Sequence, residues 1–293
     1  MPDTASDKTL IMGGTGTIGS YLVRELLPDQ SHLDIICAAR SDKSGESLRR
    51  LGYPTVALDL TRPQTLLSAM QGVSTLFMLK PYSIDYLIQS KCVIDAARKA
   101  GVQHVVNLGS FGADDTPWTS IGWNRLVEAY LQVSGMHYTH LRPNFFMDNV
   151  LRRTDRTSGR IVHYFADTPV SWIAAQDIAR VAAAVLRNPA AHRGRALPLA
   201  AESRTMADIA AIASRVCGRT FTAVYVPPAE SLAQLLQLGW QEAFARPFVD
   251  YMQAIAQGRV PEVGDTHDTV AEIAGRPAVS WESFIAEHRS FLI

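Results

Sequence analysis

The stretch "TLIMGGTGTIGSYLVREL", residues 9–26, decides the fold. A short apolar run leads into glycines, and a segment of helical character follows them. Glycine permits the positive φ of a tight turn and leaves room for a phosphate to approach the backbone, while a helix N-terminus presents N–H groups to the anion. The spacing Gly13-x-x-Gly16-x-x-Gly19 between a strand and a helix therefore predicts a dinucleotide-binding turn.

The first half of the chain continues to alternate between strand and helix patterns. Further short apolar runs occupy residues 34–39, 55–59, 75–79, 104–108 and 137–141. Helix-like spacers of roughly 10 to 20 residues separate these runs. Such alternation predicts right-handed βαβ units and a parallel sheet covered on both faces. We therefore expect an α/β fold, with a doubly wound parallel-sheet Rossmann domain over residues 1–150.

The second half of the chain has a different pattern. Strand candidates that look isolated lie at residues 159–165 and 194–200, and residues 221–226 are a further strand candidate. Thr205 and Asp208 form a capping box, which predicts a helix that ends at Gly218. Much of the remainder is helical in pattern. We expect residues 151–293 to form a smaller C-terminal α/β substrate-binding region, in which the helix over 177–187 packs back on the Rossmann domain.

Composition excludes several classes of protein. The 293 residues include 28 basic and 28 acidic ones, so nothing indicates a nucleic-acid partner. No apolar run approaches the roughly 20 residues that a membrane helix needs, and the N-terminus lacks a secretory pattern. Three widely spaced cysteines are typical of reduced thiols, so we expect a cytoplasmic protein. The five lysines all lie at or before Lys99.

The end of the second strand indicates which dinucleotide binds. An NAD site usually has an acid there for the ribose 2′-OH, but this chain has Arg40, with Lys43 within reach. The forked donors of arginine match a 2′-phosphate, so we expect NADP(H) in preference to NAD(H). Asp59 ends the third strand. Contact with the adenine amino group and capping of the following helix explain it equally well.

Several motifs together resemble one family. They are "GGTGTIG" with Arg40, "ALDL" (57–60), "VVNLGSFGA" (105–113), "VEAYLQVSGMHYTHLRPNFFMDN" (127–149), "VSWIAAQDIARVAAAVL" (170–186) and "THDTVAEIAGRPAVSWESFIAEH" (266–288). In this order they resemble the NmrA-like branch of the atypical short-chain dehydrogenases, over nearly the whole chain. Its members include quinone reductases, triphenylmethane reductase, isoflavone reductase relatives and clavine-type iminium reductases, as well as regulators that bind the nucleotide without catalysis.

The resemblance implies positions for the cofactor. The pyrophosphate would bind Gly13, Thr15, Gly16, Thr17, Ile18 and Gly19. Arg40 would hold the 2′-phosphate, and Asp59 with Leu60 would border the adenine. The ribose and nicotinamide side would be lined by Leu79, Lys80, Pro81, Gly109 and Ser110. The nicotinamide would be flanked by Asn144, Phe145 and Phe146.

The usual proton donors of the family are missing. None of the nine tyrosines has a lysine four residues on, so there is no Tyr-x-x-x-Lys pair. Isoflavone reductase relatives use a lysine in the region of residues 120–128, which here contains none. Several quinone-reductase-like members carry a histidine four residues before the position of Glu128, and this chain has Asn124 there.

These absences leave three hypotheses. We expect an NADPH-dependent reductase whose acceptor takes hydride readily: a quinone, an iminium or imine, an enone or a charged dye. The alternative is a non-catalytic NADP(H)-sensing regulator that binds a protein partner. A weaker third is an isomerase or cyclase that keeps the nucleotide for structure.

Loops at the carboxyl ends of the strands supply candidates for an acceptor pocket. They are Tyr82, Phe111, Trp123, Asn124, Phe145, Phe146 and Met147, with Tyr164 and Trp172 from the C-terminal region. Their aromatic density is typical of a site for a flat, hydrophobic small molecule, although ordinary core positions would explain about half of them. Tyr82 and Asn124 are the polar candidates for a catalytic role. His137 and His140 lack further ligands nearby, so we predict no metal. Both a monomer and a homodimer fit the sequence.

Overall fold

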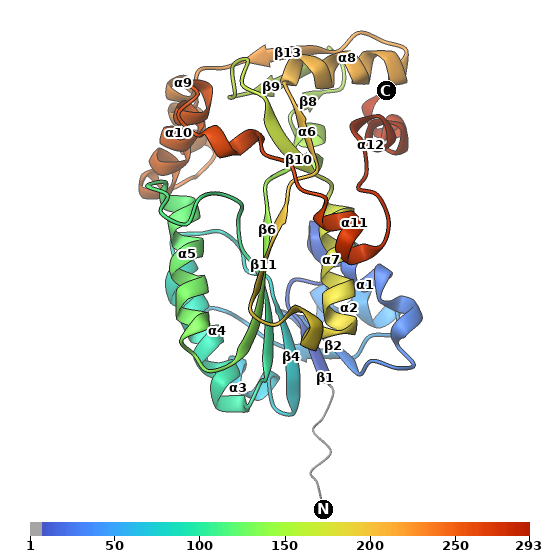
Figure 1. Ribbon diagram of the computed structural model, residues 1–293, viewed down its shortest axis with the longest axis vertical. Helices are drawn as coiled ribbons and strands as arrows, with labels where there is room; N and C mark the ends of the chain where they lie inside the picture. Colours follow the sequence, from blue (N-terminus) through green and yellow to red (C-terminus); the bar gives the residue numbers. More distant parts are fainter. Residues whose placement is uncertain (1–7) are drawn as a thin grey trace, which may run out of the picture. The chain divides into compact units, whose positions relative to one another are not determined.

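Seven strands form one sheet in a computed structural model that describes residues 8–293, in the order β11-β6-β5-β4-β1-β2-β3 (Figure 1). Their bounds are β1 (Lys8–Ile11), β2 (Ile35–Ala39), β3 (Thr55–Ala57), β4 (Val73–Met78), β5 (His104–Leu108), β6 (His137–Pro143) and β11 (Arg195–Leu199). All six strands expected before residue 142 are present, with ends displaced by two residues at most. The α/β fold class is confirmed.

The seventh strand corrects one prediction. The run over residues 194–200 looks isolated in sequence, but as β11 it forms the edge of the large sheet next to β6. Its partner precedes it by more than 50 residues in the chain, and pairing over that distance leaves no local signal in the pattern.

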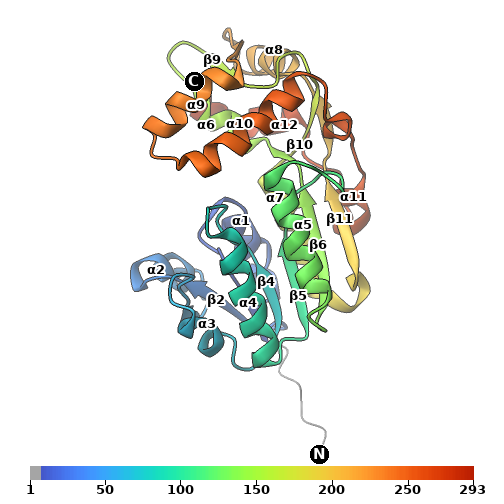
Figure 2. The same ribbon diagram turned by 90° about the vertical axis from the view of Figure 1, so that its left-hand side faces the viewer.

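Helices cover both faces of this sheet (Figures 1 and 2). Figure 1 shows α3 (Gln64–Ala69), α4 (Tyr86–Ala100) and α5 (Thr119–Gln132) on one face, and α1 (Thr17–Glu25), α2 (Asp42–Arg50) and α7 (Ala175–Arg187) on the other. Within α4 the buried side chains recur at helical spacing, from Tyr86 through Ser90 and Val93 to Ala97. The side chain of Tyr86, the first residue of α4, therefore lies on the buried face of the helix.

The order of the strands reverses beside β1. Strand β1 pairs in parallel with β2 on one side and with β4 on the other, so Thr9 lies between Ile35 and Thr75. Strand β4 pairs in parallel with β5, which pairs in parallel with β6. In sheets of this kind, ligands bind outside the carboxyl ends of the strands at the point of reversal. The ends of β1 and β4 therefore border the expected ligand site.

The chain divides into two compact units. Unit 1 comprises residues 1–110, 123–142 and 178–197, and unit 2 comprises residues 111–122, 143–177 and 198–293. The expected boundary at residue 150 falls within a segment of unit 2, while most of the helix over 177–187 belongs to unit 1. All five lysines lie in unit 1, and unit 2 contains none.

Unit 2 contains two small sheets, ordered β12-β10-β7 and β13-β9-β8. The strands are β7 (Phe145–Phe146), β8 (Thr154–Asp155), β9 (Arg160–His163), β10 (Val170–Ile173), β12 (Glu202–Arg204) and β13 (Thr222–Tyr225). The helices are α6 (Asp148–Arg152), α8 (Met206–Cys217), α9 (Pro228–Gln237), α10 (Glu242–Ala256), α11 (Thr269–Ala274), α12 (Trp281–Glu287) and α13 (Arg289–Leu292). Short 3-10 helices occupy Leu27–Asp29, Pro189–His192 and Pro261–Gly264.

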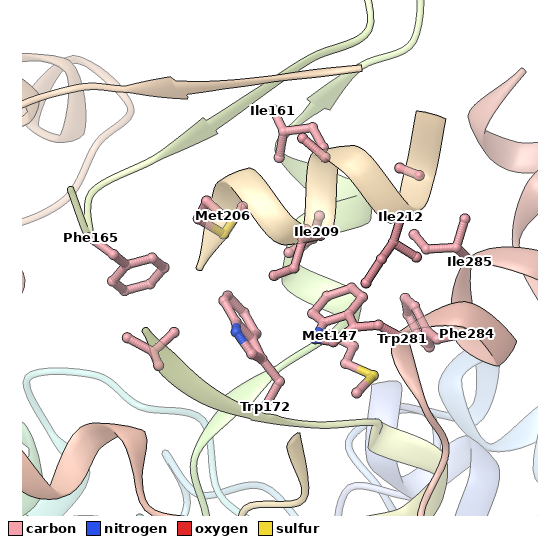
Figure 3. Packing of buried hydrophobic residues seen from close by; sticks show 14 of the residues in the cluster. Met147, Ile161, Phe165, Trp172, Met206, Ile209, Ile212, Trp281, Phe284 and Ile285 are labelled. Atoms are coloured by element: carbon pink, nitrogen blue, oxygen red, sulfur yellow. The ribbon is translucent and has the colours of Figure 1, made fainter. Parts of the chain in front are cut away.

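The core of unit 2 combines aliphatic side chains with several buried aromatic rings. Trp172 of β10 and Trp281 of α12 lie edge to face, with ring centroids 5.4 Å apart. Figure 3 shows Ile209 and Ile212 of α8 pointing toward these two rings. Helix α8 begins at the predicted capping box of Thr205 and ends at Gly218, whose φ is 72°. Within residues 8–293, no helix combines the length and apolar character that crossing a membrane requires.

Candidate functional site

The glycines of the turn between β1 and α1 lie where a side chain would meet other atoms. Gly13 has φ 77°, and a Cβ atom there would lie 2.8 Å from Cδ2 of Leu79. A Cβ atom on Gly19 would lie 2.0 Å from the carbonyl oxygen of Gly13. Gly16 is the N-cap of α1 and has no side chain to cap the first N–H groups. These residues fit the pyrophosphate of a dinucleotide, because the close-packed turn brings uncapped N–H donors to its surface.

The remaining turn residues divide by burial. Thr15 and Gly16 are exposed and Thr17 is half-buried. Ile18 is only 4% exposed and packs into the interior, so the backbone is the part of Ile18 that a phosphate could contact. The exposed side chain of Thr15 and the buried side chain of Ile18 thus leave the backbone of the turn as the source of hydrogen-bond donors.

Arg40 lies exposed at the end of β2, and Lys43 lies exposed in the first turn of α2. The Ser41 hydroxyl accepts a hydrogen bond from the Ser44 backbone N–H at 3.2 Å and fixes the start of that helix. Ser41 is the N-cap of α2, so Arg40 lies between the last residue of β2 and the start of that helix. The Arg40 cation is close enough to Asp59 to contribute to the lowered pKa of that carboxyl.

Asp59 closes the loop that leads to α3. Its Oδ1 accepts hydrogen bonds from the Thr61 hydroxyl at 2.7 Å and the Thr61 backbone N–H at 2.9 Å. These two bonds hold the pKa of the Asp59 carboxyl below its usual value. The carboxylate therefore has a local structural role, and the neighbouring Leu60 is half-buried.

A polar cluster lies beyond the ends of β4 and β5. Lys80 is 8% exposed, and its Nζ lies 3.3 Å from Oδ1 of Asn107 and 5.0 Å from the centroid of the Tyr86 ring. The Tyr86 hydroxyl donates to Oδ1 of Asn124 at 2.6 Å. We refer to Lys80, Tyr86, Asn107 and Asn124 as the lysine cluster. Burial lowers the pKa of the Lys80 ammonium from 10.5 to about 7.

Two aromatic side chains lie next to this cluster. The Tyr82 ring is 5.3 Å from that of Tyr86 and 5.8 Å from that of Trp123. Tyr82 is 39% exposed and Trp123 is half-buried. The predicted residues Tyr82, Trp123 and Asn124 thus come together in unit 1, where exposed aromatic surface lies beside buried polar groups. Pro81, the residue before Tyr82, is exposed.

Glu128 is a buried carboxylate on α5, four residues after Asn124 of the lysine cluster. It is 1% exposed, and its carboxylate accepts from Arg142 at 2.6 Å and from Arg125 at 3.1 Å. A Cβ atom on Gly109 would lie 2.8 Å from Oε1 of Glu128, and the Gly109 N–H donates to the Leu141 carbonyl. Glu128 thus links α5 to β6 through Arg142, and its carboxylate lies close to Gly109. The next residue, Ser110, is half-buried.

The other predicted residues lie in unit 2, and several serve its core. Nδ2 of Asn144 donates to the Ser171 hydroxyl at 2.6 Å and to the Val263 carbonyl at 3.0 Å. Phe111 packs against His267 at 5.7 Å, and Phe146 is half-buried. Met147 is fully buried in the apolar cluster around Trp172, so it has no surface to offer a ligand.

Unit 2 also contains a pocket with a volume of about 80 Å³. Its walls include Phe145, Arg153, Phe165, Trp172 and Phe248. The Phe145 ring is 4.8 Å from Phe165 and 5.7 Å from Trp172. Tyr164 does not line the pocket itself but contacts one of its walls, because the guanidinium of Arg153 lies 4.6 Å from the Tyr164 ring centroid. Phe145 and Trp172 are therefore predicted residues that line an aromatic pocket.

Sequence reasoning missed two members of the lysine cluster. Tyr86 has no lysine four residues after it, so a search for Tyr-x-x-x-Lys does not find it as a catalytic candidate. Asn107 belongs to no catalytic motif and stands within a predicted strand. The lysine comes instead from the preceding loop, six residues earlier, where a helical spacing rule cannot find it. Among residues 8–293, no group of three or more His, Cys, Asp or Glu side chains lies close enough to hold a metal ion.

Comparison with known proteins agrees with this arrangement. Residues 5–262 match the model of the NmrA-like family. The chain belongs to this family.

Among NmrA-like relatives, NAD(P)H azoreductase of Xenophilus azovorans is 32% identical over 284 residues, covering 95% of this chain and 97% of that protein. Agroclavine dehydrogenase of Claviceps fusiformis is 27% identical over 293 residues, covering 96% of this chain and 97% of that one. The structure of Citrobacter sp. triphenylmethane reductase in complex with NADP(H) superposes with a TM-score of 0.82 at 24% identity, covering 96% and 99%. That likeness shows a common NmrA-like fold.

Proposed function

We propose that this NmrA-like protein is an NADPH-dependent reductase that transfers hydride to a conjugated, largely aromatic acceptor such as a quinone, an azo compound, an imine or iminium, or an enone. The observation that carries the proposal is the close-packed glycine turn followed by Arg40 in place of an acid. The curated relatives support it, since they are named as an NAD(P)H azoreductase, a quinone oxidoreductase and a clavine dehydrogenase.

The cofactor would be held by residues that the fold brings to one edge of the sheet. The turn Gly13–Gly19 would bind the pyrophosphate through backbone N–H groups at the start of α1, while the Gly16 N–H donates to the Gly13 carbonyl within the turn. Arg40 and Lys43 would bind the 2′-phosphate, which favours NADP(H) over NAD(H). Bound there, the dinucleotide supplies hydride. The chain's own contribution is to orient the acceptor and to keep water from it.

The acceptor class follows from the side chains beside the expected nicotinamide position. Tyr82 and Trp123 present aromatic surface next to the lysine cluster, which favours flat conjugated molecules. Aromatic walls also line the pocket of unit 2. The Tyr86 hydroxyl donates to Asn124, so Asn124 orients Tyr86, and Tyr82 is the more exposed of the two tyrosines.

The test is turnover by the purified protein against a panel of acceptors. Loss of NADPH absorbance is followed with a benzoquinone, a naphthoquinone, an azo dye, a cyclic imine, an enone and a cationic triarylmethane dye, each also with NADH. We expect turnover with one or two classes and a higher kcat/KM for NADPH than for NADH. Tight NADPH binding without turnover of any acceptor would overturn the reductase and favour a nucleotide-sensing regulator.

A further inference from the structure

Lys80 is a buried lysine for which residues 8–293 provide no ion-pair partner. Of the five lysines, the other four are exposed or half-buried, and Lys91 pairs with Asp95 at 2.6 Å. Within the described part of the chain, Asn107 Oδ1 is the hydrogen-bond acceptor for the Lys80 Nζ, and the face of Tyr86 is its second partner. An ammonium carries three donors, and its burial is costly unless they are satisfied. Filling space alone therefore does not account for a lysine here.

The position of Lys80 is tied to the glycine turn. The preceding residue, Leu79, is the side chain that a Cβ atom on Gly13 would meet at 2.8 Å. Asn107 lies on β5, in register with Met78 of β4. Lys80 thus lies at the carboxyl end of β4, beside the reversal of strand order where a dinucleotide binds in such sheets.

The cluster contains a donor that no protein group uses. Nδ2 of Asn107 is buried and has no hydrogen-bond partner among the described residues. An unsatisfied buried amide costs about 1–3 kcal/mol unless a ligand or water completes it. This Nδ2 belongs to the amide whose Oδ1 accepts from Lys80, so the buried amine and the unused donor lie next to each other in the cluster.

Burial brings the pKa of Lys80 close to neutral pH. Burial raises the pKa of the Tyr86 hydroxyl above its usual value, and burial with nearby cations lowers the pKa of His140 on β6 to about 3. Glu128 on α5 is bound by Arg125 and Arg142. The Lys80 pKa of about 7 suits an acid that must both give and regain a proton at neutral pH.

We propose that Lys80 is the proton donor for acceptors that must gain a proton together with the hydride. The role rests on the proposed reductase function. Tyr86 and Asn107 are positioning residues that hold the amine, and Asn124 holds Tyr86 through its hydroxyl. In a Tyr-x-x-x-Lys pair the lysine follows the tyrosine in the sequence. In the lysine cluster, Lys80 precedes Tyr86 and would itself give the proton.

The balance of the reaction distinguishes two kinds of acceptor. A neutral quinone, azo compound or imine that receives hydride is left with an electron pair on oxygen or nitrogen. The N–H bond of Lys80 breaks, its electron pair stays on the amine, and a new O–H or N–H bond forms on the acceptor. The amine then regains a proton from water. A cationic iminium or triarylmethane dye becomes neutral on receiving hydride and needs no proton.

The experiment compares these acceptors in Lys80→Met and Lys80→Arg, with the exposed Lys99→Met as the matched control. With a neutral acceptor we expect both Lys80 variants to lose about 10²-fold or more in kcat, while Lys99→Met is unchanged. With a cationic dye, which needs no proton, the two Lys80 variants should lose much less kcat than with the neutral acceptor, and Lys99→Met should again be unchanged. For wild type, kcat with the neutral acceptor should fall above pH 7 and kcat with the dye should not.

Equal losses with both acceptors would show that Lys80 only supports the fold or binds cofactor, and no loss with either would also overturn the role. No turnover by wild type with any acceptor would instead overturn the reductase itself. A second readout needs no turnover. In protein labelled at the lysine ¹³Cε, the five lysine resonances are followed with pH, and Lys80→Met identifies its own. A midpoint near 7 supports the proposal, and a midpoint near 10.5 overturns it.

Discussion

Gly19 faces the backbone of Gly13 so closely that a Cβ atom on Gly19 would lie 2.0 Å from the Gly13 carbonyl oxygen. We expect Gly19→Ala to push α1 away from the turn and to weaken NADPH binding by more than about 10-fold, with a lower Tm. Fluorescence titration with NADPH and thermal unfolding check this.

Gly122→Ala is the control for this substitution. Gly122 lies within α5, and the nearest atom to its added Cβ would be the Thr116 carbonyl oxygen at 3.9 Å. Alanine in a helix interior is favoured over glycine by about 0.5–1 kcal/mol, so this variant should be as stable as wild type or more so. Similar NADPH affinities for the two alanine variants would contradict the packing argument.

In the proposed site, Arg40 would bind the 2′-phosphate that distinguishes NADP(H) from NAD(H). Removing its guanidinium takes away charge-assisted hydrogen bonds that only a 2′-phosphate can accept. We expect Arg40→Ala to raise the Kd for NADPH about 10-fold or more and to leave the Kd for NADH nearly unchanged. The comparison is Arg50→Ala, since Arg50 lies on the exposed surface of α2 and pairs with Glu46. An equal effect on both dinucleotides would show that Arg40 does not read the 2′-phosphate.

Glu128 is a buried carboxylate with two arginine partners. Glu128→Gln keeps the shape but leaves Arg125 and Arg142 as partly buried cations without their acid. We expect a loss of about 3–5 kcal/mol in the free energy of unfolding, measured with urea. The matched variant Glu46→Gln breaks the exposed pair with Arg50 and should cost far less. If the two variants lose equally little, the Glu128 pairs contribute no more than surface pairs.

Lys80 gives the free energy of unfolding a pH dependence of known sign. The unfolded chain holds the Lys80 proton up to the ordinary pKa of 10.5, and the folded chain holds it only up to about 7. Between these values the unfolded state binds more protons, so stability rises with pH, by at most about 1.4 kcal/mol per unit from this group. Lys80→Met should be more stable than wild type at pH 7, and the difference should shrink toward pH 10. Urea unfolding at several pH values measures it, and a constant difference would contradict the low pKa.

Local pattern was sufficient to predict most of the large sheet. The six strands before residue 142 and the helix after Thr205 follow from apolar periodicity and capping, which are properties of neighbouring residues. The edge position of β11 and the separate segments of the two units depend on contacts between distant residues. These contacts leave no trace in a short window of sequence, so the boundary expected at residue 150 could not anticipate them.

The site shows the same division. The glycine turn is encoded within seven residues, so its close packing could be predicted. The lysine cluster joins residues of a loop, one strand and two helices, and its key contact is between the Lys80 amine and the face of Tyr86. Burial decides the chemistry of both groups, and burial depends on the whole fold. Met147 shows the same dependence on the whole fold. Its place after Phe145 and Phe146 suggested a pocket residue, but its side chain packs into the core of unit 2.

The distribution of lysine has a practical consequence for handling the protein. Since unit 2 contains no lysine, an amine-reactive resin or dye can attach only to unit 1, and its most reactive targets there are the surface amines. An enzyme coupled to a support in this way keeps every residue of unit 2 chemically untouched. A protease that cuts after lysine likewise cannot cleave beyond Lys99, so residues 100–293 stay on one fragment that carries all of unit 2.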